Sequence, residues 1–213
     1  MVVTVEQMKA LEKRADQAGL SYLRMMENAG QAAVEAMLRE KPSIRTAAVF
    51  CGKGNNGGDG LVVARLLKQR GIGVLLILAE GKPVTTDAAT NLFLAVREDI
   101  PMVFGVKLTE DDIAWITNCD AVVDGMYGTG FHGALRIEGE ICCGAFNRAK
   151  GLKVALDVPS GVNADTGEIA QGAVRADLTV AFHAAKACHE KAAAQCGRVE
   201  VADIGITAAL RNA

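Results

Sequence analysis

The chain has 213 residues, of which 50% are hydrophobic and 23% charged, and its formal net charge is −2. This length suits one well-buried domain. The nearly balanced charge offers no electrostatic basis for binding nucleic acid or an anionic membrane, so we expect neither as a partner. There is no signal peptide and no apolar run long enough to cross a bilayer, so we expect a cytoplasmic location.

Cysteine usage agrees with a reducing compartment. The six cysteines form no C-x-x-C pair, and the adjacent Cys142 and Cys143 are poor disulfide partners. We therefore expect reduced thiols, most of them filling the core.

The N-terminal segment predicts two helices. In the first, over residues 4–18, Thr4 and Gln7 form a capping box and Gly19 ends the helix. The second starts at Ser21 and ends before Pro42. Both precede the first strand, so we expect an N-terminal extension to the α/β unit, with apolar faces available for a homodimer.

The rest of the chain alternates between strand and helix patterns. Strands are expected at 47–51, 74–79, 102–104, 121–124, 154–157, 178–182 and 199–201, and helices at 59–69, 86–96, 110–117 and 139–149. Such alternation implies right-handed crossovers between parallel strands. The predicted fold is a three-layer α/β/α Rossmann-like sandwich with a largely parallel sheet and two extra N-terminal helices, forming a single domain over residues 1–213.

A glycine-rich loop separates the first strand from its helix. Residues 51–60 read C-G-K-G-N-N-G-G-D-G, and the following helix directs free N–H groups at this turn, which favours phosphate. Gly52-x-Gly54-x-x-Gly57 fits a dinucleotide fingerprint, and Glu80 stands about twenty residues further on, where a ribose-binding acid is expected. An NAD-dependent oxidoreductase is therefore one alternative.

Other residues of this loop argue against a simple dehydrogenase site. Asn55 and Asn56 stand where such loops carry small or apolar residues. Asp59 would repel a pyrophosphate unless it caps the helix or a cation is present, and the sequence leaves both interpretations open.

Polar residues follow three later strands. Asp124 precedes a second glycine-rich turn at residues 128–133, Asp157 is followed by Ser160, and the strand at 178–182 leads to His183 and Lys186. Ligands of open α/β sheets bind beyond the carboxyl ends of the strands. We therefore expect these residues to converge on one site, although strand-end aspartates also cap turns.

Four motifs resemble the YjeF N-terminal domain family. They are G-K-G-N-N-G-G-D-G at 52–60, V-D-G-M-Y-G-T-G at 123–130, A-L-D-V-P-S-G-V-N-A-D-T-G at 155–167 and A-D-L-T-V-A-F at 176–182. The resemblance extends over nearly the whole chain. The family's enzyme is NAD(P)HX epimerase, called apolipoprotein A-I-binding protein in mammals. Many bacterial members continue into a dehydratase domain that this chain lacks, so the resemblance implies a separate dehydratase as pathway partner, and also a homodimer.

The resemblance implies an isomerase that interconverts the R and S forms of hydrated NADH and NADPH (NADHX and NADPHX) at C6. It implies substrate-binding roles for Asn55, Asn56, Gly57, Gly58, Asp59, Gly128, Thr129, Gly130, Phe131, His132, Gly133, Ala134, Asp157 and Lys186. It also implies a potassium ion held by Asn56, Asp124 and Ser160, a donor set of low charge that suits K⁺ better than a divalent metal. Asp157 is the candidate general acid/base.

Two other function classes remain open from the sequence. An oxidoreductase would transfer hydride, whereas an epimerase conserves the redox state of its substrate. A non-enzymatic binding protein, suggested by the family's protein-partner name, would retain its function without Asp124 and Asp157.

Overall fold

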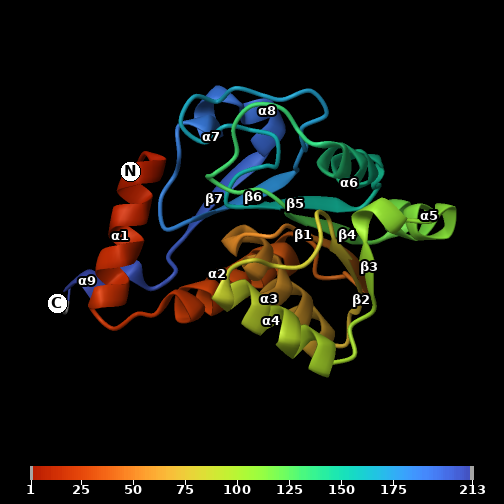
Figure 1. Cartoon of the computed structure of the whole chain (residues 1–213), viewed down its shortest axis with the longest axis horizontal. Coiled ribbons are helices and arrows are strands. Elements are labelled where there is room, and N and C mark those ends of the chain that lie inside the picture. Colours follow the sequence, from red (N-terminus) through yellow and green to blue (C-terminus); the bar gives the residue numbers. More distant parts are fainter. Residues whose placement is uncertain (1, 212–213) are drawn as a thin grey trace.

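The computed structural model describes residues 2–211 and contains one sheet of seven parallel strands. The strands are β1 (Thr46–Cys51), β2 (Gly73–Leu78), β3 (Met102–Phe104), β4 (Ala121–Gly125), β5 (Leu152–Leu156), β6 (Leu178–Phe182) and β7 (Arg198–Ala202). Their spatial order is β3-β2-β1-β4-β5-β6-β7. Each predicted strand is present, and the parallel Rossmann-like sheet is confirmed (Figure 1).

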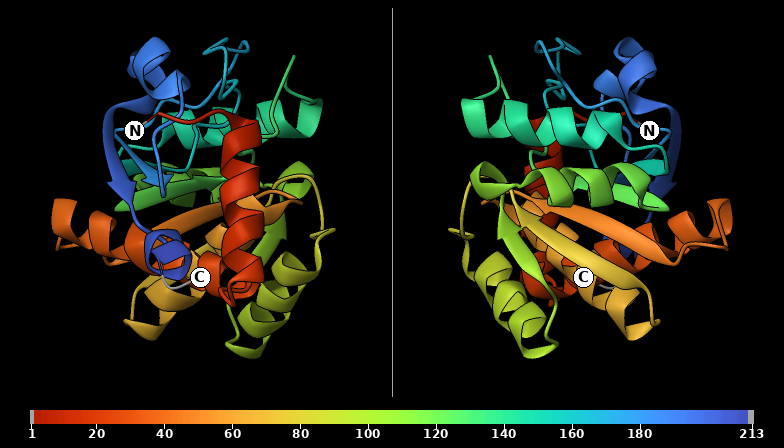
Figure 2. Two further views of the ribbon diagram at one scale, coloured as in Figure 1. Left: turned by 90° about the vertical axis from the view of Figure 1, so that its left-hand side faces the viewer. Right: turned by 90° about the vertical axis from the view of Figure 1, so that its right-hand side faces the viewer.

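Helices cover both faces of this sheet, so the predicted three layers are also confirmed. The helical segments are α1 (Val5–Gln17), α2 (Tyr22–Glu40), α3 (Asn55–Gln69), α4 (Thr86–Arg97), η1 (Gly105–Lys107), α5 (Glu110–Asn118), α6 (Ile137–Arg148), α7 (Cys188–Lys191), α8 (Ala193–Cys196) and α9 (Ile206–Arg211). Helices α2, α3 and α4 lie on one face, and α5 and α6 lie on the other (Figures 1 and 2).

The central strand β1 shows why these strands read as continuous apolar runs. Successive side chains of a strand point to opposite faces. Ala47, Val49 and Cys51 enter the core beneath α2 and α3, while Ala48 and Phe50 enter the core beneath α6. Because both faces are covered, no position in the strand favours a polar residue.

The two N-terminal helices have different functions in the fold. Helix α2 packs on α3 so closely that a Cβ on Gly30 would come within 2.4 Å of Val62 Cγ1. Helix α1 stands in front of the carboxyl ends of the strands (Figure 2). It is held at its N-terminal end by the bonds Val3 N–H to Ala185 O (2.9 Å) and Val5 N–H to Asp165 Oδ1 (2.9 Å).

The two extra N-terminal helices that the sequence predicts are therefore present, ahead of the first strand. Helix α2 belongs to the helical layer, and α1 closes the functional edge of the sheet. Amphipathic spacing marks an apolar face but does not say which surface covers it. The homodimer stays a prediction.

All six cysteines are buried and unpaired, in agreement with the expectation of free thiols. Among residues 2–211, no helix combines the length and apolar character that crossing a membrane requires.

The core packing leads to a stability prediction for a matched pair of phenylalanines. Phe146 of α6 is fully buried and meets Phe50 edge-on, with 5.9 Å between ring centroids, whereas Phe93 of α4 is 62% exposed. Phe146→Ala should lower the free energy of unfolding by about 3–5 kcal/mol because it leaves a cavity. Phe93→Ala should change it by less than about 0.5 kcal/mol. Urea denaturation would measure both, and similar losses would contradict this account of the core.

Candidate active site

A cavity of about 560 Å³ lies at the carboxyl edge of the sheet. It is centred where the strand order reverses between β1 and β4, the position at which open α/β sheets bind ligands. Its lining comes from the carboxyl ends of six strands, with the segments that follow them, and from the two N-terminal helices. These residues are Met8, Lys9, Glu12, Tyr22, Met25, Met26, Ala29, Lys53, Gly54, Asn55, Asn56, Asp59, Glu80, Thr85, Met126, Tyr127, Gly128, Thr129, Gly130, Phe131, His132, Ala134, Arg136, Asp157, Phe182, Lys186 and Ile204.

The first glycine loop packs directly against the end of β4. A Cβ on Gly52 would lie 1.8 Å from Met126 O, and a Cβ on Gly57 would lie 2.0 Å from Gly52 O. Only glycine allows these approaches. They bring the start of α3 to the cavity, where no side chain caps the helix and its first N–H groups can bind an anion.

Asp59 does not cap this helix, so the N-cap interpretation is wrong. Gly54 is the N-cap, and Gly58 N–H already bonds to Gly54 O at 3.2 Å. The helix begins at Asn55, four residues earlier than the apolar pattern indicated, because the asparagines and glycines of its first turn carry no apolar periodicity. Asp59 instead lines the cavity from within α3.

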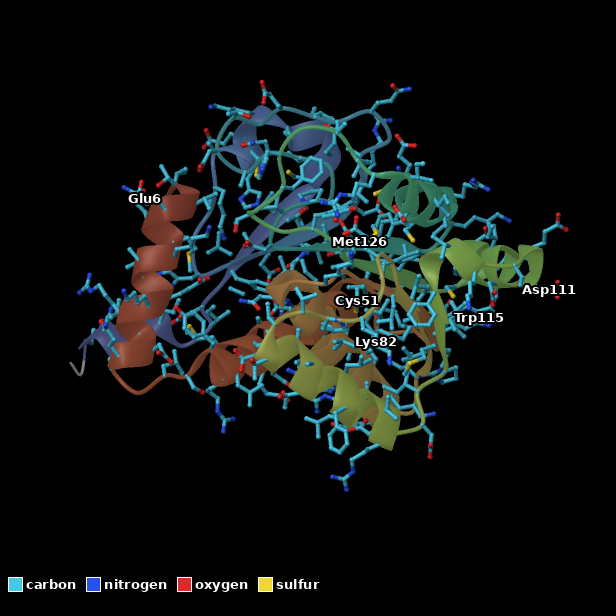
Figure 3. The ribbon with its side chains drawn as sticks, viewed as in Figure 1. Glu6, Cys51, Lys82, Asp111, Trp115 and Met126 are labelled. Carbon is cyan, nitrogen blue, oxygen red and sulfur yellow. The ribbon has the colours of Figure 1, made fainter. Side chains whose placement is uncertain are left out.

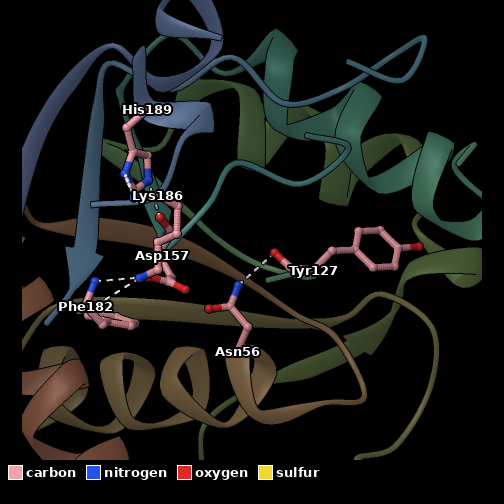
Figure 4. Close-up of polar contacts among 6 residues, drawn as sticks. All are labelled: Asn56, Tyr127, Asp157, Phe182, Lys186 and His189. Atoms are coloured by element: carbon pink, nitrogen blue, oxygen red, sulfur yellow. Dashed lines mark hydrogen bonds and ion pairs between the residues drawn. The ribbon is translucent and has the colours of Figure 1, made fainter. Parts of the chain in front are cut away.

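The second glycine loop is joined to the first by Asn56. Its side-chain Nδ2 donates to Tyr127 O at 2.9 Å, and Gly128 sits against it, since a Cβ there would be 3.1 Å from Asn56 Cβ. The amide oxygen of Asn56 is thereby turned to the side on which Asp157 lies (Figure 4). The first and second glycine loops thus form one continuous rim of the cavity.

Behind this rim, Asp124 and Ser160 form a buried pair. Asp124 Oδ1 accepts from Ser160 Oγ (2.6 Å) and Met126 N (3.1 Å), and Oδ2 accepts from Ser160 N (2.7 Å). No ion pair within the described residues neutralises Asp124, and burial raises its pKa to about 6 despite these hydrogen bonds.

This region has the donor chemistry of a monovalent cation site. Asp124 Oδ2, Ser160 Oγ and Asn56 Oδ1 each retain a lone pair beyond the hydrogen bonds described above. They supply one carboxylate, one hydroxyl and one amide oxygen, a hard donor set with a single negative charge. In the described part of the chain, no group of three His, Cys, Asp or Glu side chains is placed to hold a metal ion.

Asp157 leaves the end of β5 in an unusual conformation. Its φ is +62°, in the left-handed region that only a few residue types, Asp among them, readily adopt. Its carboxylate is held at Oδ1 by Phe182 N–H (3.0 Å) and by the ammonium of the fully buried Lys186 (Figure 4). Oδ2 makes no hydrogen bond or ion pair with the described residues, so it is available to a ligand in the cavity.

Lys186 and Asp157 are fixed to each other through His189. The Nδ1 of His189 accepts from Lys186 N–H at 3.0 Å, so its Nε2 carries the proton and donates to Asp157 O at 2.8 Å. Lys186 Nζ also donates to Phe182 O at 3.0 Å. The sequence pattern assigned no site role to His189. In the structure, its ring holds the backbone of both Lys186 and Asp157 by hydrogen bonds.

The cavity gathers an acidic cluster around this ion pair. Glu12 of α1 and Asp59 of α3 join Asp157 and Lys186 in its lining. Burial, followed by the charges of Asp157 and Glu12, raises the pKa of Asp59 well above its usual value, and Lys186 opposes this shift. The cluster therefore binds protons more readily than exposed carboxylates do.

The structure brings together eleven of the predicted site residues in the cavity lining. They are Asn55, Asn56, Asp59, Gly128, Thr129, Gly130, Phe131, His132, Ala134, Asp157 and Lys186. Gly57, Gly58, Asp124 and Ser160 are buried behind the lining, and Gly133 is exposed beside it.

Sequence reasoning missed the contributions of α1 and α2 and several charged residues of the loops. Lys53 and Arg136 adjoin the two glycine loops and could have been found from their positions. Glu80, which the sequence pattern did offer as a ribose-binding acid, also lines the cavity, where it accepts a 2.6 Å hydrogen bond from Tyr127 Oη. Nothing in the amphipathic pattern of α1 identified Glu12 as a cavity residue.

Comparison with known proteins agrees with this architecture. The family described as YjeF-related protein N-terminus matches residues 22–188. The chain is 37% identical over 210 residues to a bifunctional NAD(P)H-hydrate repair enzyme of Archaeoglobus fulgidus, covering 99% of this chain and 43% of that protein. It thus spans less than half of that longer relative.

Shorter relatives match over most of their length. An NAD(P)H-hydrate epimerase of Limosilactobacillus fermentum is 34% identical over 205 residues, covering 94% of this chain and 95% of that protein. The crystal structure of yeast ynu0 superimposes with a TM-score of 0.77 at 25% identity and covers 89% of this chain and 83% of that one. The chain belongs to the family of YjeF-related N-terminal domains.

Proposed function

We propose that this protein epimerises hydrated NADH and NADPH at C6, converting the R isomer to a mixture with the S isomer. One observation carries the proposal: an anion-binding helix N-terminus and a fixed, partly buried carboxylate open into the same cavity. The names of the shorter relatives, which are NAD(P)H-hydrate epimerases, support it.

The cavity is divided in a way that suits a nucleotide. Lys53, His132 and Arg136 stand near the two glycine loops, where the substrate phosphates would meet the N-terminus of α3. Met25, Met26 and Phe182 add apolar surface to the same cavity for the reduced ring, and Phe182 N–H bonds to the Asp157 carboxylate. The phosphates then orient the substrate, and the ring lies within reach of the carboxylate.

Asp157 acts as the general acid/base. In the hydrated ring, C6 carries a hydroxyl next to N1. Protonation of this hydroxyl by Asp157 lets the N1 lone pair expel water and gives a planar cation, which the carboxylate stabilises. Addition of water to the opposite face restores the neutral ring with inverted configuration. Lys186 positions the carboxylate through its bond to Oδ1.

A potassium ion fits the oxygens of Asn56, Asp124 and Ser160. Bound there, the ion would offset the buried charge of Asp124 and the repulsion between carboxylates and substrate phosphates. Asn56 belongs to both the ion site and the glycine loops, so it couples the two.

The product isomer has a natural consumer. The longer relatives are named bifunctional repair enzymes. We propose that a dehydratase takes up the S isomer that this protein supplies.

The activity can be measured directly on resolved R-NADHX or R-NADPHX in potassium buffer, with isomers followed by chromatography. The wild type should accelerate formation of the R/S mixture over a no-enzyme control. Asp157→Asn should slow it by about 100-fold or more, because the acid/base is lost. Asp111→Asn, an exposed change on α5 far from the cavity, should match the wild type (Figure 3). An unimpaired Asp157→Asn enzyme would contradict the assignment.

Water labelled with ¹⁸O tests the chemical route. Because water leaves from one face and a different water enters from the other, each inversion should introduce one solvent oxygen at C6. Mass spectrometry of the inverted isomer would detect it, with the uncatalysed reaction subtracted. If the inverted product keeps its original oxygen, the ring opens between N1 and C6 and the dehydration route is wrong.

Potassium should stabilise the fold through its buried ligands. At about ten times its Kd, the ion should stabilise by about 1.4 kcal/mol, or about 3–6 °C in Tm for a chain of this size. Thermal unfolding in K⁺ would be compared with tetramethylammonium at equal ionic strength. Asp124→Asn should lose the shift and Asp111→Asn should keep it. An equal shift in both variants would place the ion elsewhere.

A further inference from the structure

Glu12 stands out as a charged residue within the apolar stripe of α1. Met8 and Ala15, which lie on the same face of this helix, are buried. Glu12 lies one turn after Met8, at a position where the stripe would take a hydrophobic residue, and it lines the cavity instead. Within residues 2–211, no hydrogen bond or ion pair engages its carboxylate.

The position of this carboxylate is fixed by anchors at both ends of α1. The N-terminal end is bonded to Ala185 and Asp165. At the other end, Leu20 N–H bonds to Ala15 O at 2.9 Å, and the helix packs against α9. Helix α1 therefore forms a wall of the cavity in front of the strand ends (Figure 2), and its Glu12 lines the same cavity as Asp157, which comes from the end of β5.

The surroundings of Glu12 suit proton transfer. Burial, followed by the charge of Asp157, raises its pKa, while Lys186 and Lys9 oppose the shift. Tyr22 of α2 and Asp59 of α3 also interact with it. The carboxyl of Glu12 therefore binds a proton more readily than the carboxyl of an exposed glutamate does.

Inversion at C6 requires proton transfer on both faces of the ring. The planar cation loses water from one face and gains water on the other, and a carboxylate beside one face cannot reach the oxygen on the opposite face. Asp157 at the sheet edge can serve one face. The second face needs a proton-transferring group from another element of the lining, and α1 supplies Glu12.

We propose that Glu12 is the second acid/base of the epimerase, serving the ring face opposite to Asp157; this rests on the epimerase function proposed above. One carboxylic acid protonates the C6 hydroxyl, the C6–O bond breaks, and the N1 lone pair forms the C=N⁺ bond. On the other face, the second carboxylate takes a proton from water as its oxygen bonds to C6, and the C=N⁺ electrons return to N1. At the end of the reaction, the carboxyl that was protonated is ionised and the other is protonated. This is the protonation state from which the reverse reaction starts.

The test follows inversion and ¹⁸O exchange separately, using resolved R- and S-NADHX in labelled water. Glu12→Gln should lower the inversion rate by about 100-fold or more. In this variant one isomer, the one whose hydroxyl faces Asp157, should still exchange its C6 oxygen with retention of configuration. Asp157→Asn should show the complementary pattern, with exchange surviving in the other isomer only. A merely structural role for Glu12 would remove exchange from both isomers together.

Matched variants separate this role from effects on folding and binding. Glu6→Gln makes the same chemical change at an exposed position of α1 and should leave both rates unchanged (Figure 3). Glu12→Met restores the apolar stripe, so it should fold with a Tm at or above that of the wild type and still lose inversion. The Kd for NADP⁺, measured by calorimetry, should stay within about threefold in both Glu12 variants.

Two results would overturn the proposal: inversion by Glu12→Met or Glu12→Gln within about threefold of the wild type, or equal loss of exchange in both isomers by a folded variant. Failure of the proposed function itself is distinguishable, because then the wild type would not invert either isomer.

Discussion

The site depends on the contact between the β1–α3 loop and the end of β4. Gly52 passes so close to Met126 O that no side chain fits between them, and Gly57 packs against Gly52 in the same way. This contact places the N-terminus of α3 at the point where the strand order reverses. It also brings Asn56 to the second glycine loop, so both loops and the Asp124–Ser160 pair form one unit.

The positions of the Asp157 carboxylate and the Lys186 ammonium are fixed by a second set of contacts. Asp157 and Lys186 come from different strand ends, yet His189 bonds to the backbone of both, and the ammonium is fully removed from water. A buried ammonium requires a partner, and breaking such a pair leaves an uncompensated charge. Separating Lys186 from Asp157 would therefore lower the stability of the fold. This cost keeps the Asp157 carboxylate in one orientation.

Much of the architecture could be predicted because it follows from local chemistry. Seven apolar runs separated by amphipathic segments are sufficient to predict a parallel sheet, and the strand-end aspartates identify its carboxyl edge. The start of α3 could not be placed because Asn55 to Gly58 carry no apolar spacing and helix propensity alone disfavours them. The tertiary contact with β4 makes that turn helical.

By itself, the sequence determined the fold class, the two glycine loops and the candidate residues Asp124, Asp157 and Lys186, because strand–loop–helix periodicity and strand-end position are local properties. Only the tertiary structure decided where α1 lies. Its stripe of Met8 and Ala15 requires an apolar partner, but many surfaces could supply one. The structure places this helix across the strand ends, which makes Glu12 part of the cavity, because such packing depends on contacts between residues far apart in the chain.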